Sequence, residues 1–156
     1  MPNDEHLVFD WEAAKTLPPQ MPYLSLFTDD QGRSRLGMCT MDGFVPSVIG
    51  GKTDALWQRS LPTDVVGVKY LVMPVGWQGA WHESPAPQWV IPLSGRWFLE
   101  SAAGERIEMG PGDLHWGQDL NTTDGRGHRS GQIGEEPCVL LMLQFASPQG
   151  SGACPL

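Results

Sequence analysis

Long apolar runs are absent from this sequence. No run approaches the roughly 18–20 residues that a membrane-spanning helix needs, so we expect no membrane segment. The opening residues, MPNDEHLVFDWEAAK, also lack a basic stretch followed by an apolar one, which predicts no secretory signal. Neither a membrane protein nor a secreted protein is therefore indicated.

Cysteine and basic residues are scarce. The three cysteines, Cys39, Cys138 and Cys154, are odd in number and have no C-x-x-C spacing, which favours reduced thiols in a cytoplasmic protein over a disulfide framework. We expect Cys39 and Cys138 to be buried. Ten lysines and arginines stand against 18 acidic residues, for a net charge of −8, and the basic residues are scattered. Because phosphate binding depends on basic side chains, we expect no nucleic-acid partner.

Helix signals are also few. Residues 11–15 can form one short turn, capped by Asp10 and stopped by Pro18 and Pro19. Elsewhere 19 glycines and 14 prolines separate short apolar runs, which is typical of strands joined by tight turns. Pro92 interrupts one run and predicts a bulge or an edge position there. About ten strands are expected, at 23–27, 35–39, 65–73, 88–93, 96–101, 106–109, 113–118, 127–132 and 138–145, with the run 55–58 after the Gly50-Gly51 break.

This pattern predicts an all-β fold, either an antiparallel sandwich or a barrel. The length of 156 residues fits a single domain with a normal core. Within it we expect an N-terminal extension at 1–22, a core barrel at about 65–145 and a loose tail at 147–156.

Two stretches carry the candidate chemistry. The stretch 76–95, GWQGAWHESPAPQWVIPLSG, contains His82 and Gln88, and the stretch 110–129 contains His115 and His128. Imidazoles that converge from different strands serve as metal ligands or as general bases. Residues 82 and 84 share one face of a strand, so an inward His82 brings Ser84 with it. We expect the two stretches to meet inside one barrel.

The first stretch resembles the first motif of the cupin superfamily, which consists of double-stranded β-helix (jelly-roll) barrels that hold a metal. That motif has the form G-x5-H-x-H-x(3–4)-E-x6-G. The matching positions in this chain are Gly76, His82, Ser84, Gln88 and Gly95. The spacing agrees throughout, but Ser84 stands in place of the second histidine and Gln88 in place of the glutamate.

The second stretch follows the second cupin motif, G-x5-P-x-G-x2-H-x3-N, more loosely. Gln118 stands at the proline position, and a longer loop at 119–127 delays the histidine to His128. The chain is more similar to a group of small bacterial cupins with H-x-A-P-x-x-Q and G-x-G-H-R-[ST] segments, matched here by HESPAPQ at 82–88 and GRGHRS at 125–130. This resemblance covers roughly 65–145 and implies a site made of His82, Gln88 and His128.

Several residues in these stretches leave alternatives open. Gln88 could ligate a metal through its amide oxygen or orient another group by a hydrogen bond. We expect the His115 side chain to face outward; the alternative is that it lines the cavity. Trp116 and Gln118 have the opposite strand parity, so an inward Gln118 places Trp116 inside the barrel too. The tryptophans, Trp81 and Trp116 among them, either fill the core or form the wall of a pocket for a small planar ligand.

Three functions are compatible with these residues. The first is a metal-dependent small-molecule enzyme. A divalent ion (Fe, Mn, Ni or Zn) would bind to His82 and His128, and Gln88, His115 or water would complete its ligand shell. The ion would polarise the substrate or activate water or dioxygen. The second is a metal-free isomerase, epimerase or cyclase with His82 or His128 as general base. The third is a non-catalytic barrel that binds a small ligand. A cupin-type fold hosts all three, so substrate and reaction class stay open.

The expected partners are a small molecule and a second copy of the chain. The cupin resemblance implies a homodimer, because many cupins pair through strands of their N-terminal segment. The segment Leu7-Val8-Phe9 is the candidate for that exchange.

Overall fold

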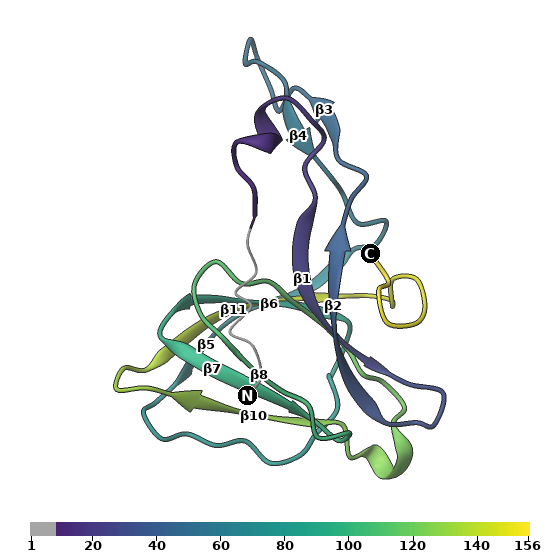
Figure 1. Ribbon diagram of the computed structural model, residues 1–156, viewed down its shortest axis with the longest axis vertical. Coiled ribbons are helices and arrows are strands. Elements are labelled where there is room, and N and C mark those ends of the chain that lie inside the picture. The colour runs from purple at the N-terminus through teal and green to yellow at the C-terminus, as the bar shows by residue number, and fades with distance from the viewer. Residues whose placement is uncertain (1–8) are drawn as a thin grey trace.

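The computed structural model describes residues 9–156 and is built almost entirely of strands (Figure 1). The only helical segments in this part of the chain are two single 3-10 turns, η1 (Ala13–Lys15) and η2 (Thr123–Gly125). The strands are β1 (Met21–Thr28), β2 (Ser34–Met41), β3 (Val45–Ser47), β4 (Leu56–Gln58), β5 (Val65–Met73), β6 (Gln88–Ser94), β7 (Arg96–Ser101), β8 (Arg106–Met109), β9 (His115–Gln118), β10 (His128–Ile133) and β11 (Cys138–Phe145).

The strands form one large sheet, one small sheet and a hairpin. The large sheet has six strands in the order β2-β1-β9-β6-β11-β5, and the small sheet has the order β10-β7-β8. All pairs are antiparallel except β1 with β9, which is parallel. Figure 1 shows the small sheet facing the large one across the body of the molecule. The predicted all-β class is confirmed in this form, a mixed-sheet sandwich or barrel.

The main core lies between the two sheets. Strand alternation sends every second side chain of β1 inward, including Leu24 and Leu26, and Val90 of β6 joins them. Trp97 and Leu99 of β7 close this core from the small sheet. Burial of such side chains contributes about 1.5–3 kcal/mol each, which makes the two-sheet arrangement the stable one.

A second apolar cluster covers the outer face of the large sheet. It is centred on Tyr23, Trp89, Trp116 and Phe145, all buried, and Leu156 from the C-terminal segment packs against it. The expectation of a loose tail at 147–156 is wrong, because these residues are tied to the sheet. The backbone N–H of Leu156 donates to the Tyr23 hydroxyl at 3.2 Å, for example.

A disulfide also fastens the C-terminal segment. Cys39 of β2 is bonded to Cys154, 115 residues later in the chain. The expectation that all three thiols are reduced is therefore wrong for this pair, and the cysteines no longer favour a cytoplasmic location. Cys39 and Cys138 are buried as expected, and burial raises the pKa of the free Cys138 thiol.

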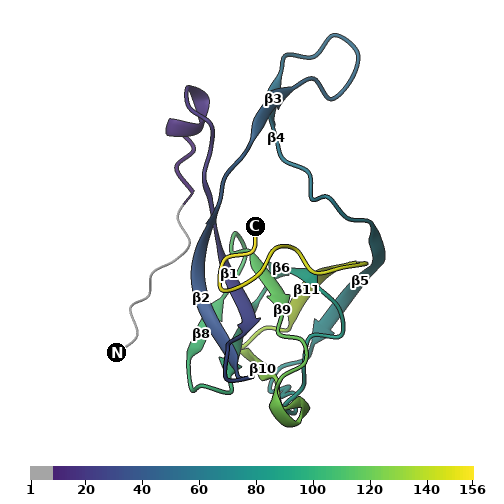
Figure 2. The ribbon, with the colours of Figure 1, turned by 90° about the vertical axis from the view of Figure 1, so that its right-hand side faces the viewer.

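The hairpin β3–β4 projects from the body as an arm, as the two views in Figures 1 and 2 show. Its strands are only three residues long; β4 lies within the run 55–58 that follows the Gly50-Gly51 break, and the sequence did not single out β3. No helix within residues 9–156 is long and apolar enough to cross a membrane.

The segment proposed for strand exchange is Leu7-Val8-Phe9. Leu7 and Val8 lie outside the described residues, and Phe9 packs edge-on against Trp11.

The strand predictions are confirmed with small shifts. The ranges 65–73, 96–101, 106–109 and 138–145 agree fully with β5, β7, β8 and β11. In the pairing of β6 with β11, Pro92 lies opposite Leu140 and Ser94 lies opposite Val139, so β6 has one extra residue at this point. This extra residue is a bulge, and the predicted bulge at Pro92 is confirmed. The helical turn at 11–15 is reduced to η1, and Asp10 Oδ1 accepts the Ala13 N–H at 2.9 Å as the expected cap does.

Candidate functional site

A buried carboxylate, Asp119, holds the candidate site together. Its Oδ2 accepts a hydrogen bond from Nδ1 of His128 at 2.8 Å. Its Oδ1 accepts two more, from the hydroxyl of Ser84 at 2.6 Å and from the Ser84 N–H at 2.9 Å. Asp119 has no exposed surface, and Ser84 and His128 are buried beside it. Asp119 thus joins the first predicted stretch to the second.

The charge of Asp119 is maintained by these donors. Burial alone raises the pKa of this carboxyl, but the hydrogen bonds from His128 and Ser84 lower it more, and the net pKa lies below the ordinary 3.8. An ionised carboxylate can only accept, so the proton in the 2.8 Å contact belongs to Nδ1 of His128. The lone pair of the neutral ring is then on Nε2, which has no hydrogen-bond partner among residues 9–156.

Ser84, Gln88 and His115 converge on the inner side of Gly117. A Cβ built on Gly117 would lie 2.9 Å from Ser84 Oγ, 3.2 Å from His115 Nε2 and 3.6 Å from Gln88 Cγ. The glycine therefore leaves just enough room for three polar side chains from different segments. Gln88 also accepts a hydrogen bond from Nε2 of Gln144 at 3.2 Å, which fixes its amide.

His115 faces the interior and is almost completely buried. The expectation that it faces outward is wrong, because the residues of β9 with the parity of His115 point toward the small sheet. Its Nδ1 donates to the Leu24 carbonyl at 3.3 Å, and its ring lies edge-on to Trp97 with centroids 5.8 Å apart. Burial, with a smaller contribution from His128, lowers the pKa of His115 to about 3. His115 is therefore neutral at physiological pH, and because its proton is on Nδ1, its Nε2 carries a lone pair.

His82 lies at the exposed edge of the site. Its backbone forms a two-way bridge with His128, with both N–H···O distances 2.8 Å, and the two rings have centroids 4.5 Å apart. Gly127 makes this bridge possible, because a Cβ there would lie 2.1 Å from the His82 carbonyl oxygen. Nδ1 of His82 donates to the Ala80 carbonyl at 2.8 Å.

Metal binding by the predicted ligands His82, Gln88 and His128 stays a prediction, although the ring nitrogens of the histidines have one feature of metal-binding histidines. Nδ1 of His82, of His115 and of His128 is engaged by an oxygen, which leaves Nε2 free as in many metal-binding histidines. However, within residues 9–156 no group of three or more His, Cys, Asp or Glu side chains is placed to share one ion. Gln88 adds only a neutral oxygen that already accepts from Gln144.

Three predicted pocket residues lie away from this cluster. Trp116 and Gln118 share the outer face of β9, where Trp116 Nε1 donates to Gln118 Oε1 at 3.0 Å and Gln118 binds the backbone of Gln149. Trp81 lies beneath the guanidinium groups of Arg126 and Arg129, 4.5 and 5.4 Å from its ring centroid. The tryptophans are thus divided among the core, the outer face and the surface, and do not wall one pocket.

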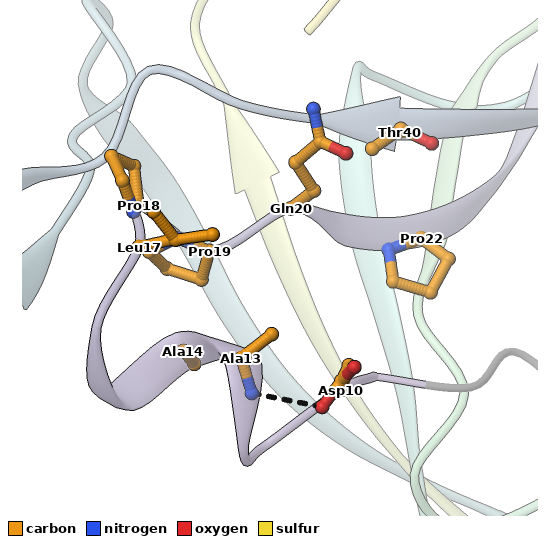
Figure 3. Close-up of a pocket in the computed structure, with 9 residues that line it drawn as sticks. All are labelled: Asp10, Ala13, Ala14, Leu17, Pro18, Pro19, Gln20, Pro22 and Thr40. Carbon is orange, nitrogen blue, oxygen red and sulfur yellow. Dashed lines mark hydrogen bonds between the residues drawn. The ribbon is translucent and has the colours of Figure 1, made fainter.

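A separate surface pocket lies at the start of β1. Figure 3 shows its lining, which includes residues from Asp10 to Pro22 and Thr40 of β2. Its volume is about 680 Å³, and its only charged lining residue is Asp10, whose carboxylate already accepts the Ala13 N–H. The pocket contains none of the predicted site residues.

Sequence reasoning missed one residue of the site, Asp119, and did not single out Trp97, which lies beside His115. Asp119 was assigned to the loop 119–127, although the period-two series from His115 through Gly117 reaches it directly. Trp97 Nε1 is buried and has no hydrogen-bond partner within residues 9–156, which marks it as a free donor in the interior. Nothing in the sequence distinguishes Trp97 from the other tryptophans.

The candidate site therefore consists of Ser84, Gln88, His115, Asp119 and His128, with His82 at its edge. Comparison with known proteins adds no assignment, since no protein-family model matches the chain and no curated protein matches it.

Proposed function

We propose that this chain is a cupin-type β-barrel enzyme that isomerises a small molecule by proton transfer, without a bound metal, with His128 as the general base. The observation that carries this proposal is the buried hydrogen bond from His128 Nδ1 to Asp119 at 2.8 Å. The cupin assignment rests on the spacing of the motif from Gly76 to Gly95 and on the two facing sheets.

Asp119 gives His128 the properties of a base. It holds the proton on Nδ1, so the lone pair of Nε2 is available to remove a proton from a substrate. Its negative charge then stabilises the imidazolium ion that forms. Return of the same proton to another atom of the substrate completes an isomerisation, and this cycle needs no co-substrate.

The neighbours of the base keep it in place and contact the substrate. Ser84 uses both its hydroxyl and its backbone N–H to hold Oδ1 of Asp119, which prevents the carboxylate from turning away from His128. Neutral His115 is suited to accept a hydrogen bond from a substrate hydroxyl or amine at Nε2. Trp97 Nε1 can donate one to a substrate oxygen.

A hydrogen-exchange screen tests the proposal. The protein is freed of metal with a chelator and incubated in D2O with a pool of small carbonyl compounds, and deuterium incorporation is followed by mass spectrometry. We expect exchange into at least one compound that persists in chelator and is lost in His128→Ala. Exchange that needs an added divalent ion, or that survives in His128→Ala but not in His82→Ala, would contradict this function.

A second candidate function is non-catalytic binding of a small ligand. It is favoured by the buried, unpartnered Nε1 of Trp97 beside the neutral ring of His115. These two groups offer one donor and one acceptor in a largely apolar interior, which is a common arrangement for orienting a ligand. A ligand that quenches Trp97 fluorescence with equal affinity in wild type and in His128→Ala, and that is never turned over, would support this function instead.

A further inference from the structure

A row of interior residues crosses the large sheet at the level of Gln88. The strand pairings place four residues side by side across β5, β11, β6 and β9, namely Gly67, Gln144, Gln88 and Gly117. Gln88 has the strand parity of Val90, and Gln144 has that of Leu140, and both of these apolar residues belong to the main core. The two amides therefore point into the space between the sheets, where Gln88 is 4% and Gln144 is 8% exposed.

Gly117 opens the space that the Gln88 side chain enters. A Cβ on Gly117 would lie 3.6 Å from Gln88 Cγ, 2.9 Å from Ser84 Oγ and 3.2 Å from His115 Nε2. The hydroxyl of Ser84 in turn donates to Asp119, the carboxylate that holds the proposed base. The Gln88 amide thus shares one space with the groups proposed for proton transfer.

Gln144 sets the orientation of the Gln88 amide. Nε2 of Gln144 donates to Oε1 of Gln88 at 3.2 Å in a buried hydrogen bond. Gly67 leaves room for this arrangement, because a Cβ there would lie 3.1 Å from Gln144 Oε1. With its oxygen engaged, Gln88 presents its Nε2, which donates to no group of residues 9–156. A buried amide nitrogen without an acceptor is suited to bind an oxygen atom of a ligand.

The groups around this space favour a neutral ligand. Gln88 and Trp97 offer N–H donors, and neutral His115 offers an acceptor at Nε2. None of these three side chains carries a positive charge, and the ionised group beside Ser84 is the carboxylate of Asp119. A carboxylate or phosphate group of a ligand would meet this negative charge without a compensating cation. A carbonyl oxygen needs only the N–H donors.

We propose that Gln88 binds the carbonyl oxygen of a neutral substrate that carries a hydroxyl group on the adjacent carbon. Its N–H stabilises the negative charge that develops on this oxygen during the reaction. Gln144 is a positioning residue, because it acts only through the Gln88 amide. The lone pair of His115 Nε2 accepts the substrate hydroxyl. This proposal rests on the proposed function of His128 and names the substrate class of that function.

The reaction balances without a co-reactant. Nε2 of His128 removes the proton from the carbon that bears the hydroxyl, the C–H electron pair forms a C=C bond, and the carbonyl π pair moves onto the oxygen held by Gln88. The hydroxyl proton then passes to this oxygen. The imidazolium of His128 returns its proton to the former carbonyl carbon, and a new carbonyl group forms where the hydroxyl was. The product is an isomer of the substrate.

Binding is tested by NMR of the Gln88 side-chain NH2 group in ¹⁵N-labelled protein, since this test needs no turnover. The signal is assigned by its loss in Gln88→Met. Hydroxyacetone is titrated as the neutral probe and lactate as the anionic one. We expect hydroxyacetone to shift the signal in wild type and in His128→Ala, and lactate to leave it unmoved. A signal that hydroxyacetone does not move at high millimolar concentration, or that lactate moves equally, overturns the proposal.

A double-variant cycle tests the catalytic role on a substrate found by the exchange screen. Gln88→Met removes the donor at similar side-chain length, so kcat should fall roughly 10²–10³-fold with a smaller change in KM. Gln144→Met only releases the amide and should cost less. The double variant should lose no more than Gln88→Met. Gln149→Met is the matched control, because Gln149 is a buried glutamine of the C-terminal segment whose amide donates to the Ser147 carbonyl, and kcat should be unchanged.

The two tests separate this proposal from the proposed function. Thermal melting establishes that each variant is folded. A Gln88 signal that shifts with hydroxyacetone in a protein without any exchange activity supports the carbonyl site and contradicts only the role of His128. Losses of kcat that add in the double variant overturn the positioning role of Gln144. An active enzyme whose kcat is unchanged in Gln88→Met overturns the role of Gln88.

Discussion

His128 and Asp119 are joined by a buried 2.8 Å hydrogen bond in which Nδ1 of the imidazole is the donor. Asp119 begins the loop 119–127 and His128 follows its last residue, and Ser84 from the first stretch holds the other carboxylate oxygen. This relationship determines the tautomer of His128, and the proposed chemistry depends on that tautomer. The predictions below concern this pair, its surroundings and the fastening of the C-terminal segment.

Asp119→Asn should remove most of the base strength of His128. An amide can donate to Nδ1, which would move the proton of the neutral ring to Nε2 and block that nitrogen. We expect kcat to fall roughly 10²–10⁴-fold with a smaller change in KM, measured on any substrate found by the exchange screen.

Glu83→Gln is the control for Asp119→Asn. Glu83 is a carboxylate of the same region that accepts from the N–H and hydroxyl of Thr122, and it does not contact His128. Its substitution should cost some stability and leave kcat nearly unchanged. Equal loss of kcat in both variants would mean that loop anchoring, and not the tautomer of His128, is the role of Asp119.

Burial of His115 should make the protein sensitive to acid. Its pKa is about 3 when folded and about 6.5 in the unfolded chain, so between these values the unfolded state binds one proton more. The contribution is fully present above pH 6.5 and is lost as the pH falls toward 3, at up to about 1.4 kcal/mol per pH unit.

His115→Gln should therefore flatten the dependence of the unfolding free energy on pH in this window. Denaturant unfolding at several pH values between 4 and 7 measures the slope in both proteins, where the window follows from the two pKa values. The neighbours Asp119 and His128 stay in place in the variant. An unchanged slope would show that His115 already binds a proton when folded.

Gly117→Ala should fill the space on which Ser84, Gln88 and His115 converge. The added methyl group would lie 2.9 Å from Ser84 Oγ, so we expect a loss of about 1–3 kcal/mol in stability and loss of ligand binding. Gly37→Ala in β2 is the matched control, because its nearest neighbour, Phe27 Cε1, would be 3.5 Å away. Ligand binding that survives Gly117→Ala would place the binding site elsewhere.

The disulfide between Cys39 and Cys154 should fasten the C-terminal segment over Trp116. Thiol titration of the denatured, oxidised protein should find one free thiol per chain, and three after reduction. Cys154→Ser should lower stability by about 2–4 kcal/mol and speed amide exchange at 147–156. Cys138→Ala, the control, should leave the exchange of that segment slow. Three free thiols without reductant would show that the bond does not form.

The strands were predictable from the sequence because their signals are local. The run 65–73 is rich in β-branched residues, and the turns around Gly95 and Gly104 mark where β6 and β7 end. Strand β3 was not predicted because its three residues are too few to show a period. The disulfide between Cys39 and Cys154 was not predicted, because no local spacing pattern connects two residues that are 115 positions apart.

The orientation of β9 could not be predicted because both of its faces are buried. Strand parity groups His115 with Gly117 and Trp116 with Gln118, but it does not say which pair faces the core. Trp116 is more apolar than His115 and was the natural choice for the interior. The outer cluster and the C-terminal segment bury Trp116 on the opposite face, which leaves His115 in the core.

The tautomer of His128 is the central claim, and long-range ¹H–¹⁵N NMR of the histidine rings measures it most directly. The chain has four histidines, and His128→Gln and Asp119→Asn assign the relevant signals in metal-free protein near pH 7.5. We predict a protonated Nδ1 and an unprotonated Nε2 for His128, with the pattern lost in Asp119→Asn. A ring protonated at Nε2 alone, or an Nε2 signal that shifts only when a divalent metal is added and activity appears with it, would contradict the account.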